Sequence, residues 1–230
     1  MKRALYAVLL SVAVTGIVCL FGSMGLGEFW EPAGLASRSR GSTASAQSPG
    51  VHARYRVVPE RSEARYRVRE QLAGLSFPND AVGQTSAIDG SLSFDGQGRV
   101  VADDSRFSVD LRMLRSDEAR RDNYLRRNTL ETDRFPTAVL VPFEIRGLPL
   151  PLPQTGTVSF ELLGDLTVRD VTRRLSWGVT ATFTGPSVSV QARTAFRFAD
   201  VSLRIPRVSV VLSVEDHIRL EADLVLQRSQ

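Results

Sequence analysis

The stretch that decides the fold is LSWGVTATF, residues 175–183, because apolar and polar side chains alternate along it. In a β-strand successive side chains point to opposite faces of the sheet, so residues two positions apart share a face. One face of this stretch is therefore apolar, while the other carries only serine, glycine and threonine. The alternation predicts a strand with one buried face, made by Leu175, Trp177, Val179, Ala181 and Phe183.

The same alternation recurs along most of the chain, at residues 63–70, 106–113, 188–198 and 218–226. Turn-forming sequences separate these windows, at residues 95–98, 168–170 and 185–186. The spacing leaves no room for the crossover helices that parallel strands need, so we predict an all-β antiparallel fold. A long sheet with one dry face must fold over on itself. We therefore expect a closed barrel of about eight strands, which has no free edges.

One segment breaks the pattern, RRDNYLRRNTLETDRFPTAVL at residues 120–140. It is charged, it has the character of a helix, and it ends at Phe135-Pro136, since the residue before a proline disfavours helix. Ser116 is the expected N-cap, with Asp117 and Glu118 in the first turn. We expect one or two short helices here, covering one mouth of the barrel. Two roles stay open: a plug that only shields the barrel end, or a lid beside a ligand entrance.

The first residues are typical of a targeting element. Lys2 and Arg3 precede an uncharged run from Ala4 to Gly27, which as a helix would span roughly 36 Å, enough to cross a bilayer. The length of the run favours an uncleaved anchor, and a signal peptide cleaved near the A-x-A triplet at 44–46 is the alternative. We predict a signal anchor or signal peptide at 1–28, a flexible linker at 29–52 and a barrel domain at 53–228. Either interpretation places the domain outside the cytoplasm, in the periplasm or at the cell surface.

Composition argues against several classes of function. The net charge of +4 includes Lys2 and Arg3, so the excess on the rest of the chain is too small to suggest a nucleic-acid surface. Cys19 is the only cysteine, and the two histidines, His52 and His217, are far apart, which makes a zinc site improbable. No phosphate-binding loop, dinucleotide fingerprint or nucleophile elbow is present. We expect neither a cofactor nor a metal, and no catalytic residues.

A barrel of this size is either filled by its own side chains or holds one small or chain-like ligand. Small residues on the dry faces fit both alternatives, because they can leave a lumen or simply match the taper of the barrel. If a lumen exists, alternation assigns its lining to the large residues of the dry faces and of the helical insert. The candidate ligand-binding residues are Phe94, Phe107, Val109, Leu111, Tyr124, Phe135, Trp177, Phe183, Phe196 and Phe198.

Three segments in this order resemble the YceI-like family of exported lipid-binding proteins, over about residues 55–226. The first joins Ser116 to the residues RDNYL (121–125) and ETDRFP (131–136), the second is LTVRDVT (166–172), and the third combines 196–201, Pro206 and 214–216. The resemblance implies an extended antiparallel barrel like that of the lipocalins. It also implies that a long apolar molecule, a polyisoprenoid in particular, is bound inside the barrel without catalysis.

We therefore expect an extracytoplasmic protein that binds or carries a polyisoprenoid or similar lipid in its lumen. The expected partners are this lipophilic molecule and the membrane, through the N-terminal helix, with no nucleic acid and with a homodimer left open. A filled barrel that serves as a cell-envelope interaction or stress-related module is the alternative. A reaction in the lumen, dependent on Asp122 or Asp200, is the third hypothesis.

Overall fold

The computed structural model describes residues 51–229 except residue 75 and residues 207–210. The expected N-terminal helix and most of the expected linker lie outside these residues. Among the residues described, no helix is both long enough and apolar enough to span a bilayer.

The described chain consists mainly of strands, and every strand pairing in it is antiparallel. The all-β antiparallel prediction is thereby confirmed. The strands are β1 (Val51–Val57), β2 (Glu63–Leu72), β3 (Asn79–Thr85), β4 (Ile88–Asp95), β5 (Arg106–Asp110), β6 (Arg115–Ser116), β7 (Thr137–Arg146), β8 (Thr155–Val168), β9 (Val171–Thr184), β10 (Ser187–Phe196) and β11 (Val211–Ser229). The predicted turns at 95–98, 168–170 and 185–186 follow β4, β8 and β9.

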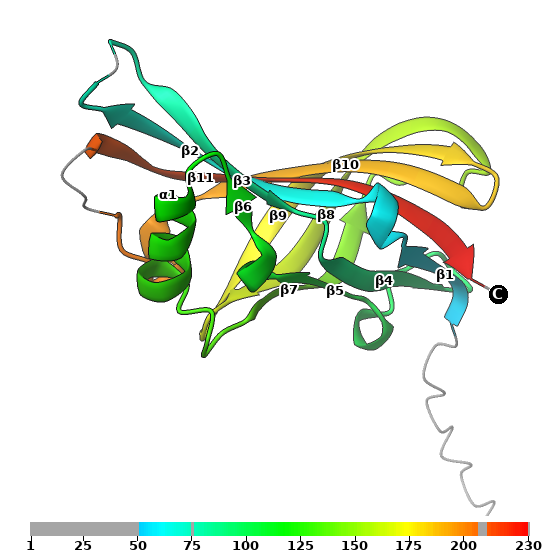
Figure 1. Ribbon diagram of the computed structural model, residues 1–230. Helices are drawn as coiled ribbons and strands as arrows, with labels where there is room; N and C mark the ends of the chain where they lie inside the picture. Colours follow the sequence, from blue (N-terminus) through cyan, green and yellow to red (C-terminus); the bar gives the residue numbers. More distant parts are fainter. Residues whose placement is uncertain (1–50, 75, 207–210, 230) are drawn as a thin grey trace, which may run out of the picture. The chain divides into compact units, whose positions relative to one another are not determined.

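Hydrogen bonds join eight of these strands into a closed ring, in the order β1-β4-β5-β7-β8-β9-β10-β11, with β11 pairing back to β1. Opposite β10, the long strand β11 pairs with two different strands: its first part pairs with β2, and its last residues pair with β1. β2 continues through β3 to β6 as a branch of the sheet. The ring is thus complete at the end that carries β1 and β4, called here the closed end. At the other, open end, β2, β3 and β6 form a separate wall, and helix α1 (Ala119–Tyr124) lies beside it (Figure 1).

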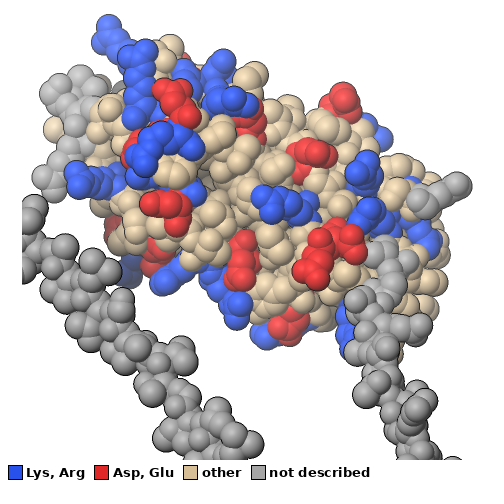
Figure 2. Space-filling model, turned by 90° about the horizontal axis from the view of Figure 1, so that it is seen from below, with Lys and Arg blue, Asp and Glu red and all other residues tan. Residues whose placement is uncertain are grey.

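Alternation along the strands sorts side chains between the interior and the outside as predicted. In β9, Trp177, Val179, Ala181 and Phe183 are buried, while Leu175 is half-buried. On the outer face of the β8–β9 hairpin, the hydroxyl groups of two cross-strand threonine pairs, Thr157–Thr182 and Thr167–Thr172, hydrogen-bond each other. Acidic and basic side chains are interspersed on the face shown in Figure 2, and several outward-facing arginines pair with carboxylates on other strands.

Two of the predicted strands end earlier than the alternation suggested. In the window 106–113, β5 ends at Asp110, whose carboxylate accepts a hydrogen bond from the amide of Arg112 at 2.9 Å and so begins the 3-10 turn η3 (Leu111–Met113). In the window 188–198, β10 ends at Phe196 and the 3-10 turn η5 (Phe198–Val201) follows. Here the amide of Phe198 donates to Asp216 at 3.0 Å. Side-chain acceptors that bind backbone amides compete with the ladder of a strand, and apolar alternation does not reveal them.

The helical insert is confirmed as one short helix, but its N-cap differs from the prediction. α1 is capped by Glu118, whose carboxylate accepts from the amide of Arg120 at 2.9 Å, and it runs into the π-helical turn η4 (Leu125–Thr129). Ser116 belongs instead to β6. Its amide and hydroxyl donate to the buried carboxylate of Asp122 at 3.0 and 2.7 Å, so the end of β6 is fastened to the helix.

Candidate ligand-binding site

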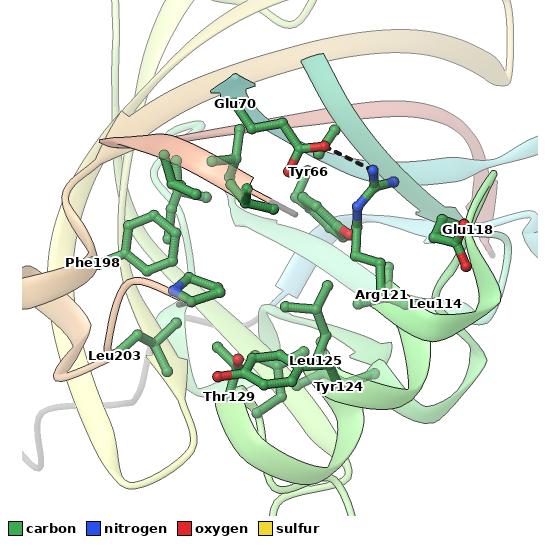
Figure 3. Close-up of a pocket in the computed structure, with 18 of the residues that line it drawn as sticks. Tyr66, Glu70, Leu114, Glu118, Arg121, Tyr124, Leu125, Thr129, Phe198 and Leu203 are labelled. Atoms are coloured by element: carbon green, nitrogen blue, oxygen red, sulfur yellow. Dashed lines mark hydrogen bonds and ion pairs between the residues drawn. The ribbon is translucent and has the colours of Figure 1, made fainter. Parts of the chain in front are cut away.

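A cavity of about 870 Å³ lies at the open end, between the β2–β3 wall, α1 and the strands opposite. Its lining is mostly apolar, with polar groups concentrated where β2 faces α1 (Figure 3). The lining residues are Tyr66, Val68, Glu70, Leu72, Asn79, Ala81, Leu111, Leu114, Asp117, Glu118, Arg120, Arg121, Tyr124, Leu125, Thr129, Leu130, Ala138, Leu166, Val168, Phe196, Phe198, Leu203, Pro206, Val211, Val214, Ile218 and Leu220.

Strand β2 supplies one wall because its side chains alternate between the cavity and the outside. Tyr66 and Val68 face the cavity, together with Glu70 and Leu72 further along the strand. The arginines between them point outward, where Arg67 pairs with Glu221 of β11 at 3.0 Å. The predicted separation of this strand into an apolar face and an arginine face is therefore confirmed up to Val68, beyond which a carboxylate joins the inner face.

The opposite wall combines residues of β7 and β8 with the turn that follows β10. Leu166 and Val168 come from β8 and Ala138 from β7, while η5 places Phe198 against the same space. The side chains of Leu166, Val168 and Phe198 are buried in one hydrophobic cluster that includes Val201, which is fully buried. This wall therefore presents a mostly apolar surface to the cavity.

α1 and η4 close the side of the cavity between β6 and β7. Tyr124, Leu125 and Leu130 turn toward the cavity, and exposed polar side chains such as Asn123 and Arg127 turn away from it. The carboxylate of Asp122, only 7% exposed, holds β6 as described above and so fixes this wall to the sheet.

The polar end of the cavity is built around an ion pair between β2 and α1. The guanidinium of Arg121 lies 2.8 Å from the carboxylate of Glu70, with side chains 18% and 8% exposed, and 2.6 Å from the exposed carboxylate of Asp117. Burial by itself lowers the pKa of Arg121, but the hydrogen bond to Asp117 and the charge of Glu70 outweigh it and raise the pKa. The arginine therefore stays protonated, and its charge is balanced by two carboxylates.

Tyr66 stands next to this ion pair and has no hydrogen-bond partner for its buried hydroxyl. Its ring lies across Gly83 of β3, its cross-strand neighbour, where any Cβ would collide with the ring. Burial raises the pKa of Tyr66 above its ordinary value, so the hydroxyl remains a neutral donor. A buried donor without a partner loses its interaction with water, and an acceptor on a ligand could restore it.

Four of the ten predicted ligand-binding residues line this cavity, namely Leu111, Tyr124, Phe196 and Phe198. Four others pack in the core of the closed end, namely Phe94, Phe107, Val109 and Phe183. Trp177 is buried in a cluster with Leu162 and Val179. Phe135 lies beneath the guanidinium groups of Arg134 and Arg169, at 5.0 and 5.5 Å from its ring centroid. Five of these six belong to the dry interior, as alternation indicated, but lie outside the lining of the cavity. Phe135, which was assigned from the helical insert, packs against arginines instead.

Several lining residues were not among the candidates, above all Tyr66, Val68, Glu70 and Arg121. Alternation had already put Tyr66 and Val68 on an inner face, yet it contains no information on how far along the barrel axis each residue lies. Arg121 lies in the charged insert, where nothing in the sequence distinguishes it from the neighbouring arginines. Its partner Glu70 had no signal in the sequence, because the two residues are separated by 51 positions.

Within the described residues, no group of three or more histidine, cysteine, aspartate or glutamate side chains is placed to hold a metal ion. The polar residues that line the cavity are two tyrosines, one threonine, one asparagine, two arginines and three carboxylates, namely Tyr66, Tyr124, Thr129, Asn79, Arg120, Arg121, Glu70, Asp117 and Glu118. This set can orient a polar group of a ligand by hydrogen bonding.

Comparisons with known proteins agree with this architecture. Solved structures with the same fold include a polyisoprenoid-binding domain from Saccharophagus degradans implicated in plant cell wall breakdown, with TM-score 0.58 and 11% identity over 76% of this chain and 98% of that chain. BcnA from Burkholderia cenocepacia has TM-score 0.54 and 13% identity over 74% and 98%. The YceI protein of Campylobacter jejuni has TM-score 0.54 and 12% identity over 70% and 91%. At these identities the likeness establishes the fold alone.

A comparison with curated proteins finds no match. The family model of the YceI-like domain matches residues 55–226, which is nearly all of the described chain. The matched range contains the closed ring, the helical insert and the cavity at the open end. The chain therefore belongs to the YceI-like family.

Proposed function

We propose that this protein binds a long lipophilic molecule, a polyisoprenoid or similar lipid, non-covalently in the cavity at its open end. The observation that carries the proposal is an apolar cavity of about 870 Å³ with a single polar end, in a closed sheet whose remaining interior is packed. Ligand pockets usually measure about 300–1,000 Å³. The Saccharophagus degradans relative, described as a polyisoprenoid-binding domain, supports the same class of ligand.

Affinity for such a ligand would come from burial of its apolar surface, at about 25 cal/mol per Å² before the losses of association. The polar end would hold the head group. Tyr66 offers an unused hydrogen-bond donor, whereas the charge of Arg121 is already balanced by Glu70 and Asp117. The carboxylates that line the cavity, Glu70, Asp117 and Glu118, outnumber its two arginines, Arg120 and Arg121, so an uncharged group that accepts a hydrogen bond fits best.

The proposed role is carriage without catalysis. The two carboxylates considered for a reaction already have structural partners. Asp122 accepts hydrogen bonds from the amide and hydroxyl of Ser116, and Asp200 accepts from the amide of Arg197 at 2.8 Å.

We also propose that the domain has a lipocalin-like barrel and works outside the cytoplasm, tethered by residues 1–28 or secreted after their removal. A homodimer stays a prediction.

The alternative of a filled barrel acting as an interaction module applies well to the closed end, where Phe94, Phe183 and Leu226 share a dense core. The cavity at the open end favours ligand binding over the interaction module.

A variant that fills the cavity distinguishes ligand binding from the interaction module. Ala138 lines the cavity, and Ala195 is exposed on the outside of β10, so Ala138→Phe has a matched control in Ala195→Phe.

The test is native mass spectrometry of the full chain purified from a bacterial envelope, followed by organic extraction. We expect the wild type and Ala195→Phe to retain an apolar molecule of defined mass and Ala138→Phe to lose it, with all three showing the same circular dichroism. A clean ligand-free mass, with no uptake of added polyprenol or long-chain fatty alcohol, would refute carriage and favour the interaction module.

A further inference from the structure

We propose that the rim of the cavity docks on the surface of a phospholipid bilayer through three exposed apolar side chains. Phe77, Leu212 and Ile205 are 80%, 67% and 37% exposed, and they are among the few large apolar residues that the described chain leaves in contact with water. Each lies within two positions of a residue that lines the cavity, namely Asn79, Val211 and Pro206 respectively. These three exposed apolar side chains therefore lie at the entrance of the cavity.

The fold brings these three residues to one end of the molecule. Leu72 of β2 pairs with Val211 of β11, so the connection between β2 and β3, which contains Phe77, lies beside the start of β11. Figure 1 shows this hairpin and the start of β11 projecting together beyond α1. Ile205 precedes Pro206, which lines the same cavity as Leu72 and Val211.

The charge of this rim fits a phospholipid surface. The segments 71–79 and 201–214 contain no aspartate or glutamate, and within their described parts the exposed Arg204 is the only charged residue. Apolar side chains beside an arginine suit the interface of a membrane, where the side chains enter the acyl boundary and the guanidinium meets phosphate. Of the acidic side chains that line the cavity, Asp117 and Glu118 belong to the α1 side, and Glu70 of β2 is paired with Arg121. The exposed Glu215 and Asp216 follow Val214 on β11, beyond these two segments.

A bilayer fits this rim better than a second protein does. Stable protein interfaces bury about 800 Å² on each partner, whereas one large side chain such as phenylalanine buries roughly 150–250 Å². Three side chains on separate segments fall short of that area, and a fluid bilayer requires no matching surface.

Docking would let a lipophilic molecule move between membrane and cavity without crossing water. The inference goes beyond the proposed function, and its test needs no ligand in the cavity.

The test places an environment-sensitive fluorophore at single cysteines of the full chain. Cys19→Ser removes the only native cysteine, after which Phe77→Cys, Leu212→Cys or Leu150→Cys is labelled with nitrobenzoxadiazole. Leu150 is the matched control, because it is 57% exposed in the β7–β8 connection, whose neighbours Leu148 and Leu152 pack on the core of the closed end. The vesicles contain phosphatidylcholine and phosphatidylglycerol, with and without a spin-labelled lipid as quencher.

On addition of vesicles, we expect the probes at positions 77 and 212 to brighten severalfold, shift to shorter wavelength and be quenched by the spin-labelled lipid. The probe at position 150 should not respond, even if the N-terminal residues hold the chain at the membrane. Adding Phe77→Asp should lower the response at position 212 roughly tenfold or more, through loss of the buried aromatic ring. Arg204→Glu should also weaken the fluorescence response at position 212. The loss should be larger on vesicles with phosphatidylglycerol than on vesicles of phosphatidylcholine alone.

Equal responses at all three positions, or none, would overturn the docking surface. A shift at positions 77 and 212 that follows protein concentration without vesicles would also overturn it, and would assign the rim to contact with a second copy. None of these results depends on extraction of a ligand. Failure of membrane docking can therefore be distinguished from failure of the proposed function.

Discussion

At the scale of single residues, the cavity differs from an ordinary core in the polar groups that it keeps. Tyr66 is held over Gly83, with its hydroxyl buried and without a partner, while Glu70 and Arg121 satisfy each other at 2.8 Å. Trp177, on a dry face outside the cavity lining, also has a buried N–H without a partner. These residues make separate predictions for stability and for binding.

The raised pKa of Tyr66 predicts a loss of stability in alkaline solution. Above about pH 10 an unfolded tyrosine releases its proton, while the folded Tyr66 retains it, so the folded state binds more protons and its stability falls as pH rises. The fall is at most ~1.4 kcal/mol per pH unit from this group. Urea unfolding between pH 9 and 11 should show a steeper decline for the wild type than for Tyr66→Phe. Parallel curves would contradict the burial of this hydroxyl.

Trp177 tests whether a dry-face residue outside the cavity acts only in packing. We expect Trp177→Ala to lower the free energy of unfolding by about 3–5 kcal/mol, as for other large core truncations. Trp177→Phe should be milder, because it keeps most of the ring volume and removes the unpaired N–H. Denaturant unfolding gives both values. Uptake of polyprenol by folded Trp177→Phe should equal that of the wild type, and a selective loss of uptake would place Trp177 in the binding site.

At the scale of elements, one short helix determines the shape of the open end. α1 is too short to be stable by itself, since isolated helices under about 12 residues are marginal in water. Its position depends on the buried Asp122 and on the pair between Arg121 and Glu70 of β2. These contacts fasten α1 to β6 and to β2, so the helix forms a fixed wall of the cavity.

Removal of the Asp122 carboxylate should therefore loosen this wall. Asp122→Ala leaves the amide of Ser116 without its side-chain acceptor and its hydroxyl with only the longer contact to the Glu118 carbonyl, at 3.3 Å. We expect this to lower the free energy of unfolding by about 1–3 kcal/mol. Hydrogen exchange should become faster in residues 116–130 and stay unchanged in β8 and β9. Asp133→Ala is the control, because Asp133 is exposed in the loop after η4. Equal effects of the two substitutions would show that Asp122 does not anchor the helix.

At the scale of the whole molecule, the ring of strands is closed and filled at one end and hollow at the other. The long strand β11 causes this asymmetry, because it pairs with β1 at the closed end and with β2 at the open end. A hollow end lined by apolar side chains lacks the packing that stabilises the closed end. A ligand in the cavity would supply that packing, so binding and stability should be linked.

This linkage predicts that a bound ligand stabilises the fold. Polyprenol at one hundred times its dissociation constant should raise the free energy of unfolding by about 2.7 kcal/mol. The shift in thermal unfolding should appear in the wild type and in Ala195→Phe, and it should be absent in Ala138→Phe, whose added ring occupies the cavity. A shift of equal size in all three proteins would mean that the lipid acts elsewhere.

The sequence by itself determined the class of fold and the sidedness of its strands. Alternation has a period of two residues and needs no partner, so Val179 and Phe183 could be placed inside, and the turn after β9 could be located, from local pattern alone. The helical insert was equally visible, because its charges and its terminating Pro136 interrupt the alternation. Local chemistry also suggested the wrong N-cap, since Ser116 suits that position as well as Glu118 does.

Only the tertiary structure decided which inner side chains meet a core and which meet a cavity. Phe183 and Phe198 are equally apolar and both were expected to line a lumen, yet one packs at the closed end and the other faces the open one. The difference lies in strand register, which sets the height of each residue along the ring. Register also brings Gly83 to Tyr66, and the packing of α1 against the β2–β3 wall brings Arg121 to Glu70. It depends on contacts between segments distant in the chain, and a local pattern carries no information about such contacts.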